Sequence, residues 1–246
     1  MKEFAADLHI HSCLSPCASE EMNPPNVINM AKLLGISIIS VCDHNCSKNV
    51  EAFIKASGKE ILVIPGMEVQ TMEEVHVLCY FKDINSMRIF ENFIYRGLPD
   101  VKNIPEIFGS QYIVNEKGDT VGIEEKMLSL SVKYSVNQIF GKVKDLGGLF
   151  VPAHIDRESY SIISNLGFIP EDIYPDALEF SKRALKERNL MNVPLIDMTK
   201  IYSSDAHNLM GLAFPPNTFF IMEDLTIDEF FRCIKGEGGR RVVIRE

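Results

Sequence analysis

The first strand-like stretch of this chain, residues 4–11, reads FAADLHIH and combines an apolar run with a His-x-His pair. The run Phe4 to Ile10 predicts a buried strand. Side chains two residues apart on a strand point to the same side, so His9 and His11 can present two imidazoles to one metal ion, while Asp7 can orient a ring. Taken alone, the pair can also be two unrelated polar residues at a strand end.

Further apolar runs follow this stretch, with helical patterns between them, which is typical of β-α repetition and a mainly parallel sheet. Asn26 to Leu34 has apolar residues at helical spacing, and Gly35 ends that helix before the run Ile36 to Val41. The other predicted strands are Ile61–Pro65, Val75–Phe81, Leu149–Pro152, Ala177–Phe180, Lys200–Ser203 and Thr218–Met222, and helices are expected in part of Ile123–Leu146 and at Ile227–Ile234.

Residues 87–119 form the least regular stretch of the sequence. It contains Gly97, Pro99, Pro105, Gly109 and Gly118. Glycine and proline at this density favour turns over regular elements. We therefore expect one α/β domain over residues 1–246, with a small insertion, a lid or edge subdomain, at about 87–119.

The composition is that of a soluble globular protein, with 46% hydrophobic and 24% charged residues. No apolar segment has the length of an export signal or a membrane span, so we expect a cytoplasmic protein that contacts no membrane. The net charge of −9 disfavours nucleic acid as a partner, although a local basic groove or bound metal ions would permit it. The six cysteines do not indicate a disulfide framework, and Cys42, Cys79 and Cys233 are expected to be packing residues.

All six histidines stand in short clusters at or near the ends of predicted strands, except that His76 lies near the start of one. The clusters are Asp7-Leu8-His9-Ile10-His11, Asp43-His44, Gly66-Met67-Glu68 with His76, His154-Ile155-Asp156-Arg157, and Asp205-Ala206-His207. Residues just beyond the carboxyl ends of parallel strands converge on one rim of an α/β fold. A hairpin would return His76 to Glu68, whose two carboxylate oxygens can bridge two cations. The combination predicts a catalytic centre with mixed nitrogen and oxygen ligands, which suit zinc, manganese or iron.

At these residues the chain resembles the PHP (polymerase and histidinol phosphatase) family, and the match runs in order from residue 7 to residue 207. The resemblance implies a distorted (β/α)7 TIM-like barrel with a trinuclear centre of divalent ions. The implied ligands are His9, His11, Glu68 and Asp205 for one ion, Glu68, His76 and His154 for a second, and His44 and His207 for part of a third.

The third ion lacks a protein ligand in this assignment. Many members of the family place an aspartate or histidine five or six residues beyond the His-x-His pair, where this chain has Ser15-Pro16-Cys17. Either Cys17, Glu20 or Glu21 replaces that ligand, or the third ion binds weakly. The CxxxC spacings of Cys13 with Cys17 and of Cys42 with Cys46 favour free cysteines in turns over metal or redox chemistry.

These residues predict hydrolysis of a small phosphorylated substrate. Two or three divalent ions, bridged by Glu68, would generate a hydroxide that attacks phosphorus. Arg157 and Arg183 can reach the same rim, where a guanidinium fork suits phosphate. Arg157 can instead pair with a neighbouring acid, and Arg183 can simply belong to a solvated helix.

Three other functions remain open at this point. Amidohydrolase barrels also begin with His-x-His, but they normally have a bridging lysine where Glu68 stands and lack the closing Asp205-Ala206-His207 pattern. An exonuclease acting on nucleic-acid ends is disfavoured by the net charge of −9. A non-catalytic metal-binding module is disfavoured because nearly the whole ligand set is present.

Overall fold

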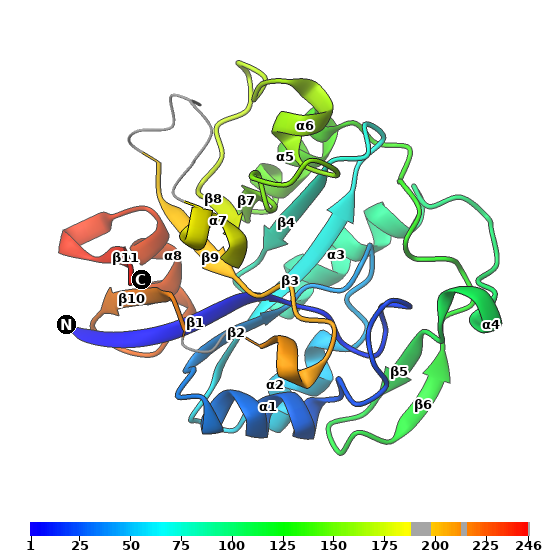
Figure 1. Ribbon diagram of the computed structural model, residues 1–246, viewed down its shortest axis with the longest axis horizontal. Helices are drawn as coiled ribbons and strands as arrows, with labels where there is room; N and C mark the ends of the chain where they lie inside the picture. Colours follow the sequence, from blue (N-terminus) through cyan, green and yellow to red (C-terminus); the bar gives the residue numbers. More distant parts are fainter. Residues whose placement is uncertain (188–197, 213–215, 246) are drawn as a thin grey trace.

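Seven strands form one curled sheet in the order β11-β10-β1-β2-β3-β4-β7 (Figure 1). The computed structural model describes residues 1–187, 198–212 and 216–245. The strands are β1 (Lys2–Ile10), β2 (Ile38–Val41), β3 (Leu62–Gln70), β4 (His76–Tyr80), β7 (Leu149–Pro152), β10 (Thr218–Met222) and β11 (Arg241–Ile244). Strands β1, β2 and β3 are parallel, whereas β4 is antiparallel to both β3 and β7. Strand β10 is antiparallel to β1 and to β11.

A second sheet of two parallel strands, β8 (Leu178–Ser181) and β9 (Lys200–Ser203), is tied to the main sheet by single backbone hydrogen bonds. Ile155 N donates to Glu179 O, and His11 N donates to Ala206 O. The expected (β/α)7 TIM-like barrel is therefore confirmed only as a mixed α/β fold with a curled half-barrel sheet. Among the described residues, no continuous set of strand pairs closes this sheet into a barrel. Strand β10 occupies the edge of β1 with which a closing strand would have to pair.

Helices connect the strands, and their starts follow from side-chain caps. Asn23, Ser135 and Thr226 each accept a backbone N–H at the first turn of α1, α5 and α8, respectively. The helices are α1 (Pro24–Leu33), α2 (Val50–Ser57), α3 (Ile84–Tyr95), α5 (Val136–Asp145), α6 (Ile162–Leu166), α7 (Lys182–Glu187) and α8 (Ile227–Ile234), with 3-10 turns at Leu209–Gly211 and Glu237–Gly239. Within the described ranges, no helix is both long and apolar enough to cross a bilayer.

The stretch 87–119, expected to be an irregular insertion, begins inside a regular helix. Asp83 caps α3, which buries Met87, Phe90 and Ile94. This i, i+3, i+7 spacing is a helical face, which the glycines and prolines further along obscured in the sequence. The irregular part follows, with the short helix α4 (Pro105–Phe108) and the hairpin β5 (Tyr112–Val114) and β6 (Thr120–Ile123), on the opposite side of the molecule from the termini (Figure 1).

The β3–β4 hairpin brings the start of β4 to the end of β3. Gln70 is paired with His76 and Glu68 with Leu78 in this antiparallel register. His76 therefore lies at the same rim as the ends of the parallel strands, although it begins its own strand.

Gly66 allows β3 to pack closely against β2, and it provides a test of this packing. A Cβ atom at Gly66 would lie 2.2 Å from Ser40 Oγ and 2.8 Å from Cys42 Sγ. We expect Gly66→Ala to lower the free energy of unfolding by about 1–3 kcal/mol through overpacking, measured by urea denaturation. Gly141→Ala is the control, since its Cβ meets nothing within 4 Å and lies in α5, where alanine should add about 0.5–1 kcal/mol. Equal stability of the Gly66 variant and the wild type would contradict this packing.

Candidate metal centre

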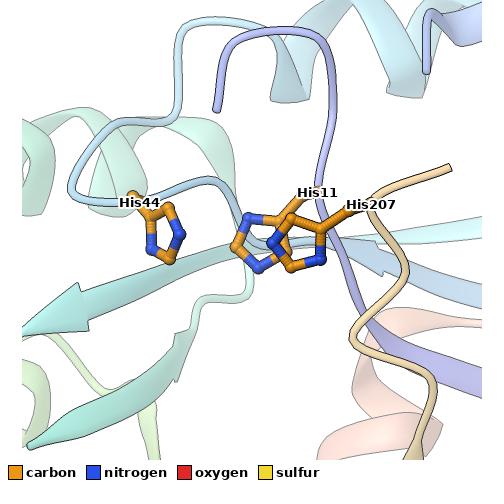
Figure 2. A group of neighbouring side chains, drawn as sticks. All are labelled: His11, His44 and His207. Atoms are coloured by element: carbon orange, nitrogen blue, oxygen red, sulfur yellow. The ribbon is translucent and has the colours of Figure 1, made fainter. Parts of the chain in front are cut away.

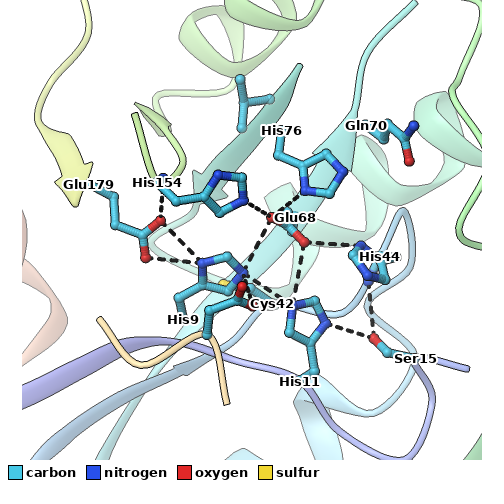
Figure 3. A network of polar contacts seen from close by, with 12 residues as sticks. His9, His11, Ser15, Cys42, His44, Glu68, Gln70, His76, His154 and Glu179 are labelled. Carbon is cyan, nitrogen blue, oxygen red and sulfur yellow. Dashed lines mark hydrogen bonds and ion pairs between the residues drawn. The ribbon is translucent and has the colours of Figure 1, made fainter. Parts of the chain in front are cut away.

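All six histidines meet at one rim of the curled sheet. Figure 3 shows five of them around Glu68, and the ring of the sixth, His207, stacks on His11 with centroids 4.2 Å apart. Two residues of this rim, His154 (φ 28°) and Asp205 (φ 50°), have backbones in the left-handed region. Such conformations are uncommon for residues with a Cβ and concentrate at functional sites, because only a constrained site keeps them.

Glu68 lies at the centre of the cluster, with a side chain that is 1% exposed. Its carboxylate contacts imidazole nitrogens on five sides. The distances are 2.8 Å from Oε1 to His76 Nδ1, 3.4 Å from Oε1 to His9 Nε2 and to His154 Nε2, 3.0 Å from Oε2 to His44 Nδ1, and 3.4 Å from Oε2 to His11 Nε2. Each oxygen faces a different set of rings, as a carboxylate that bridges two cations must.

The nitrogens of the His-x-His pair and one oxygen of Asp205 are spaced like the ligands of a single ion. His9 Nε2 and His11 Nε2 are 3.1 Å apart, and they lie 3.3 Å and 3.1 Å, respectively, from Asp205 Oδ1. Ligand bonds of about 2.0–2.1 Å in a tetrahedral site give separations of about 3.3 Å between ligand atoms. Three of the four donors expected for the first ion, His9, His11 and Asp205, are therefore spaced as the ligands of one ion would be.

Several buried polar atoms of the cluster make no well-aligned hydrogen bond, although His44 Nδ1 lies 3.0 Å from Glu68 Oε2 and His11 Nε2 lies 3.1 Å from Asp205 Oδ1. These atoms are His44 Nδ1, Glu68 Oε2, His76 Nε2, His154 Nδ1 and Asp205 Oδ1. A buried polar atom without an aligned hydrogen bond costs about 1–3 kcal/mol, and a shared cation would satisfy several of these atoms at once. Two further groups, His44 with Glu68 and His76, and His11 with His44 and His207, each have ligand atoms within 4.8 Å of one another.

The second group differs from the assignment implied by the resemblance. It combines Glu68 and His76 with His44, where the resemblance implies His154. His154 Nε2 still lies 3.4 Å from Glu68 Oε1, so all four residues are within reach of this part of the centre. Figure 2 shows His11, His44 and His207 of the third group, which extend from three separate segments of the chain.

A buried carboxylate that the sequence did not reveal, Glu179 on β8, orients two of these histidines. It lies 3.0 Å from His9 Nδ1 and accepts a 2.8 Å hydrogen bond from the backbone nitrogen of His154. Asp7, expected to orient a ring, accepts the backbone N–H of Ser204. An acid between Leu178 and Phe180 in an otherwise apolar strand was the one signal in the sequence that could have identified Glu179.

A hydroxyl network orients His11. Its Nδ1 is 2.9 Å from Ser15 Oγ, which donates to Asp43 Oδ1 at 2.7 Å, while Ser12 Oγ donates to the other oxygen of Asp43 at 2.6 Å. Outer contacts of this kind fix the ring orientation of a ligating histidine. Asp43, identified in the sequence only as a neighbour of His44, thus orients His11 through the Ser15 hydroxyl.

The electrostatics of the cluster reflect its two central carboxylates. Burial disfavours the His11 imidazolium, but hydrogen bonds to Asp205 and Glu68 outweigh it and raise the His11 pKa to about 9. Burial and the charge of His11 act against His44, yet its contacts with Cys17 and Glu68 also raise its pKa to about 9. Burial and repulsion from His11 lower the pKa of His207 to about 4. Glu68 and Asp205 therefore attract cations, and protons take that role when no metal is bound.

The two predicted phosphate-binding arginines lie in different surroundings. Arg157 Nη2 is 2.7 Å from Asp205 Oδ2 and its side chain is 41% exposed, so it lies at the edge of the cluster. Arg183 is exposed at the start of α7, where its backbone nitrogen donates to Ser181 Oγ. The structure thus places Arg157 beside a candidate ligand.

Comparison with known proteins shows which folds this one shares. No family model matches the chain. An uncharacterized protein of Methanocaldococcus jannaschii is 24% identical over 162 residues, which cover 66% of this chain and 18% of that protein. Endonuclease Q of Pyrococcus furiosus, described as lesion-specific, matches 98% of this chain and 58% of its own at 22% identity, with a TM-score of 0.68. A structure of endonuclease Q in complex with a 27-mer duplex that carries an abasic lesion matches this chain with a TM-score of 0.74.

Two other solved structures cover 83% of this chain and 88% of theirs. One is a Bifidobacterium adolescentis protein provisionally described as a metal-dependent phosphoesterase, with 18% sequence identity and a TM-score of 0.55. The other is an amidohydrolase of Chromobacterium violaceum, with 17% sequence identity and a TM-score of 0.53. This chain spans less than two thirds of the M. jannaschii protein and of endonuclease Q. At these identities the likeness establishes a shared fold, and the resemblance to the PHP family is confirmed to that extent.

Metal binding should release protons. Since the pKa values of His11 and His44 are raised to about 9, both rings hold protons at neutral pH and lose them when a cation replaces the proton. Metal affinity should therefore rise as pH increases from 6 towards 9. Titration calorimetry with zinc, in buffers of different ionisation enthalpy, measures both the affinity and the protons released. Affinity that stays constant over this range would contradict the prediction.

Glu179→Gln should weaken metal binding without unfolding the protein. The amide keeps the size of the side chain but loses the charge that orients His9, and loss of such an outer carboxylate typically costs about 10–100-fold in metal affinity. Chelator competition measures this affinity, and denaturation of the metal-free protein tests for a purely structural role. Glu91→Gln is the matched control, because Glu91 also accepts a backbone N–H, from Ser47, but lies on α3. Equal affinities in both variants would remove Glu179 from this role.

Proposed function

We propose that this protein is a metal-dependent phosphoesterase that hydrolyses a small phosphorylated substrate. The observation that carries the proposal is the buried Glu68 carboxylate, with imidazole nitrogens of five histidines within 3.4 Å of its two oxygens. A bridging carboxylate among imidazoles suits a pair of divalent ions such as zinc, manganese or iron. When bound, such ions would supply an activated water and neutralise phosphate charge.

The protein's own side chains would hold this centre in place. His9, His11 and Asp205 are the donors for one position, while Glu68 is shared with a second position that His44, His76 and His154 approach. Glu179 and the Ser15–Asp43 pair hold His9 and His11, respectively, at the required angle. Rings fixed in this way need no rearrangement as charge develops during the reaction, and such preorganisation is usually the largest electrostatic contribution to catalysis.

Arg157 is the side chain best placed to bind the phosphate. Its guanidinium uses one nitrogen for Asp205, and at 41% exposure it retains donors that face solvent. A planar fork of donors can bind two phosphate oxygens while the pair with Asp205 holds it in position. Arg183 would have a secondary role at the same rim, since it stands just after β8, the strand that carries Glu179.

A nuclease is the second candidate function. It is favoured by the likeness to endonuclease Q, which extends over 98% of this chain. The net charge of −9 favours the small substrate, because it repels a long polyanion. An amidohydrolase-like activity is less favoured, since a glutamate and not a lysine occupies the bridging position.

The proposed function can be tested with metal-free protein that is reconstituted with zinc, manganese or iron. Assays would use phosphomonoesters, nucleotides and short single-stranded oligonucleotides, and a dihydropyrimidine amide would report the amidohydrolase alternative. Turnover of phosphomonoesters alone is the expected result. Turnover of oligonucleotides alone would replace the proposal with the nuclease, and no turnover of any substrate with any of these metals would refute it.

Glu68→Gln should reduce turnover by more than about 100-fold, because the change removes the charge of a central ligand. Loss of a residue that only orients a metal ligand already lowers metal affinity or activity by about 10–100-fold. Circular dichroism of the metal-free variant checks the fold. Glu116→Gln, which changes an exposed acid in the turn between β5 and β6, is the control and should keep full activity. Full activity of the Glu68 variant would exclude the bridging role.

A further inference from the structure

The side chain of Tyr160 covers one face of the His76 ring. The two ring centroids are 4.8 Å apart with an angle of 27° between the planes, and the backbone nitrogen of His76 donates a 2.8 Å hydrogen bond to Tyr160 O. His76 is 9% exposed, whereas Tyr160 is 45% exposed. The tyrosine ring therefore lies on a candidate metal ligand and still offers a large surface to solvent.

The backbone at Tyr160 has a conformation that tyrosine rarely adopts. Its φ is 58°, in the left-handed region, where a bulky side chain is an outlier. Contacts on both sides hold the turn in place. Ser161 Oγ donates to Arg157 O at 3.0 Å and caps α6, and Asn165 of α6 donates to two backbone carbonyls in the turn between β3 and β4 (Figure 1). Backbone strain that is held in this way concentrates at active sites and at clamps for ligands.

The turn that carries Tyr160 also carries Arg157, and the two side chains extend to different parts of the metal centre. Arg157 Nη2 lies 2.7 Å from Asp205 Oδ2, while the Tyr160 ring stacks on His76. Asp205 belongs to the donors of the first position, and His76 belongs to those of the second. A phosphate bound across both positions would thus have the guanidinium on one side and the tyrosine ring on the other.

An exposed aromatic ring in this place suits a flat binding partner. Aromatic side chains stack on other planar rings, and a nucleobase that stacks on one of them gains affinity whichever base it is, because every base has a π-face. An alkyl ester has no planar group and gains less from such a surface. The ring therefore discriminates among phosphoesters by the shape of the group that the phosphate carries.

We infer that Tyr160 is a specificity-determining residue, which selects phosphoesters that carry a planar ring, such as the base of a nucleoside monophosphate, close to the phosphate. The inference rests on the proposed phosphoesterase function and names its substrate class. Arg157 and the ions would bind the phosphate, and the exposed part of the Tyr160 ring would stack on the planar group. Stacking uses the ring and not the hydroxyl, so phenylalanine should replace tyrosine in this role.

Binding of phosphonates, which cannot be hydrolysed, to the zinc-loaded protein tests this inference without turnover. One probe is the phosphonate analogue of adenosine monophosphate, and the other is the corresponding ribose phosphonate, which lacks the base. Calorimetry on the wild type should show about 5–150-fold tighter binding of the nucleoside phosphonate, as expected for one stacked base. Tyr160→Leu should lose most of this preference because only the nucleoside phosphonate binds more weakly, whereas Tyr160→Phe should keep it. The zinc content of each variant is measured in parallel.

Tyr174→Leu is the matched control and should keep the wild-type preference. Tyr174 is 72% exposed and lies in the same connection between β7 and β8. It stands at the other end of these strands, because Asp176 N, two residues further on, donates to Phe150 O near the start of β7, whereas His154 follows the end of that strand.

The possible failures can be distinguished. No preference in the wild type, or an unchanged preference in Tyr160→Leu, would overturn the role of Tyr160 while leaving the proposed hydrolysis of phosphoesters intact. Equal weakening of both phosphonates together with loss of zinc would show that the ring only supports His76, and it would overturn the inference as well. A wild-type protein that binds neither phosphonate and hydrolyses no phosphomonoester would refute both this inference and the proposed function.

Discussion

Burial of the Glu68 carboxylate is the constraint on which the rest of the structure depends. A carboxylate that is 1% exposed is costly to bury unless cationic or hydrogen-bonding groups surround it, and here five imidazoles do so. The imidazoles come from four places: His9 and His11 from the end of β1, His44 from the loop after β2, His76 from β4, and His154 from the loop after β7. The β3–β4 hairpin, the close packing at Gly66 and the loop that carries Ser15 are all arrangements that bring nitrogen atoms to these two oxygens.

Much of this arrangement is local enough to be read from the sequence. The His-x-His pair, the Asp43-His44 pair and the final Asp205-Ala206-His207 each follow a run whose strand character depends on its own residues. Strand ends converge by a general rule of α/β folds, so the meeting of distant clusters could be expected. Likewise, the strands Leu149–Pro152, Lys200–Ser203 and Thr218–Met222 have the predicted bounds, because turn residues delimit each apolar run.

What could not be predicted depends on contacts between distant parts of the chain. Glu179 belongs to the centre only because β8 lies beside the ends of β1 and β7, and a single acid in an apolar strand does not reveal its neighbour. The half-barrel arises because β10 and β11 pair antiparallel beside β1, whereas strand propensity says nothing about pairing order. The direction of the Glu20 carboxylate depends on the hydroxyl of Tyr112, which lies more than ninety residues away in the chain, so sequence spacing alone could not reveal it.

The centre draws its donors from residue 9 to residue 207, and this has a consequence for how the protein folds. No single hairpin or βα unit contains a full set of ligands, so a partly folded chain offers only part of one, such as Glu68 and His76 of the β3–β4 hairpin. Contacts over such long separations form late, because the entropy of closing long loops must be overcome first. Tight ion uptake would then mark the completion of folding, and a cell short of the metal would accumulate a finished but less stable protein, not a misfolded one.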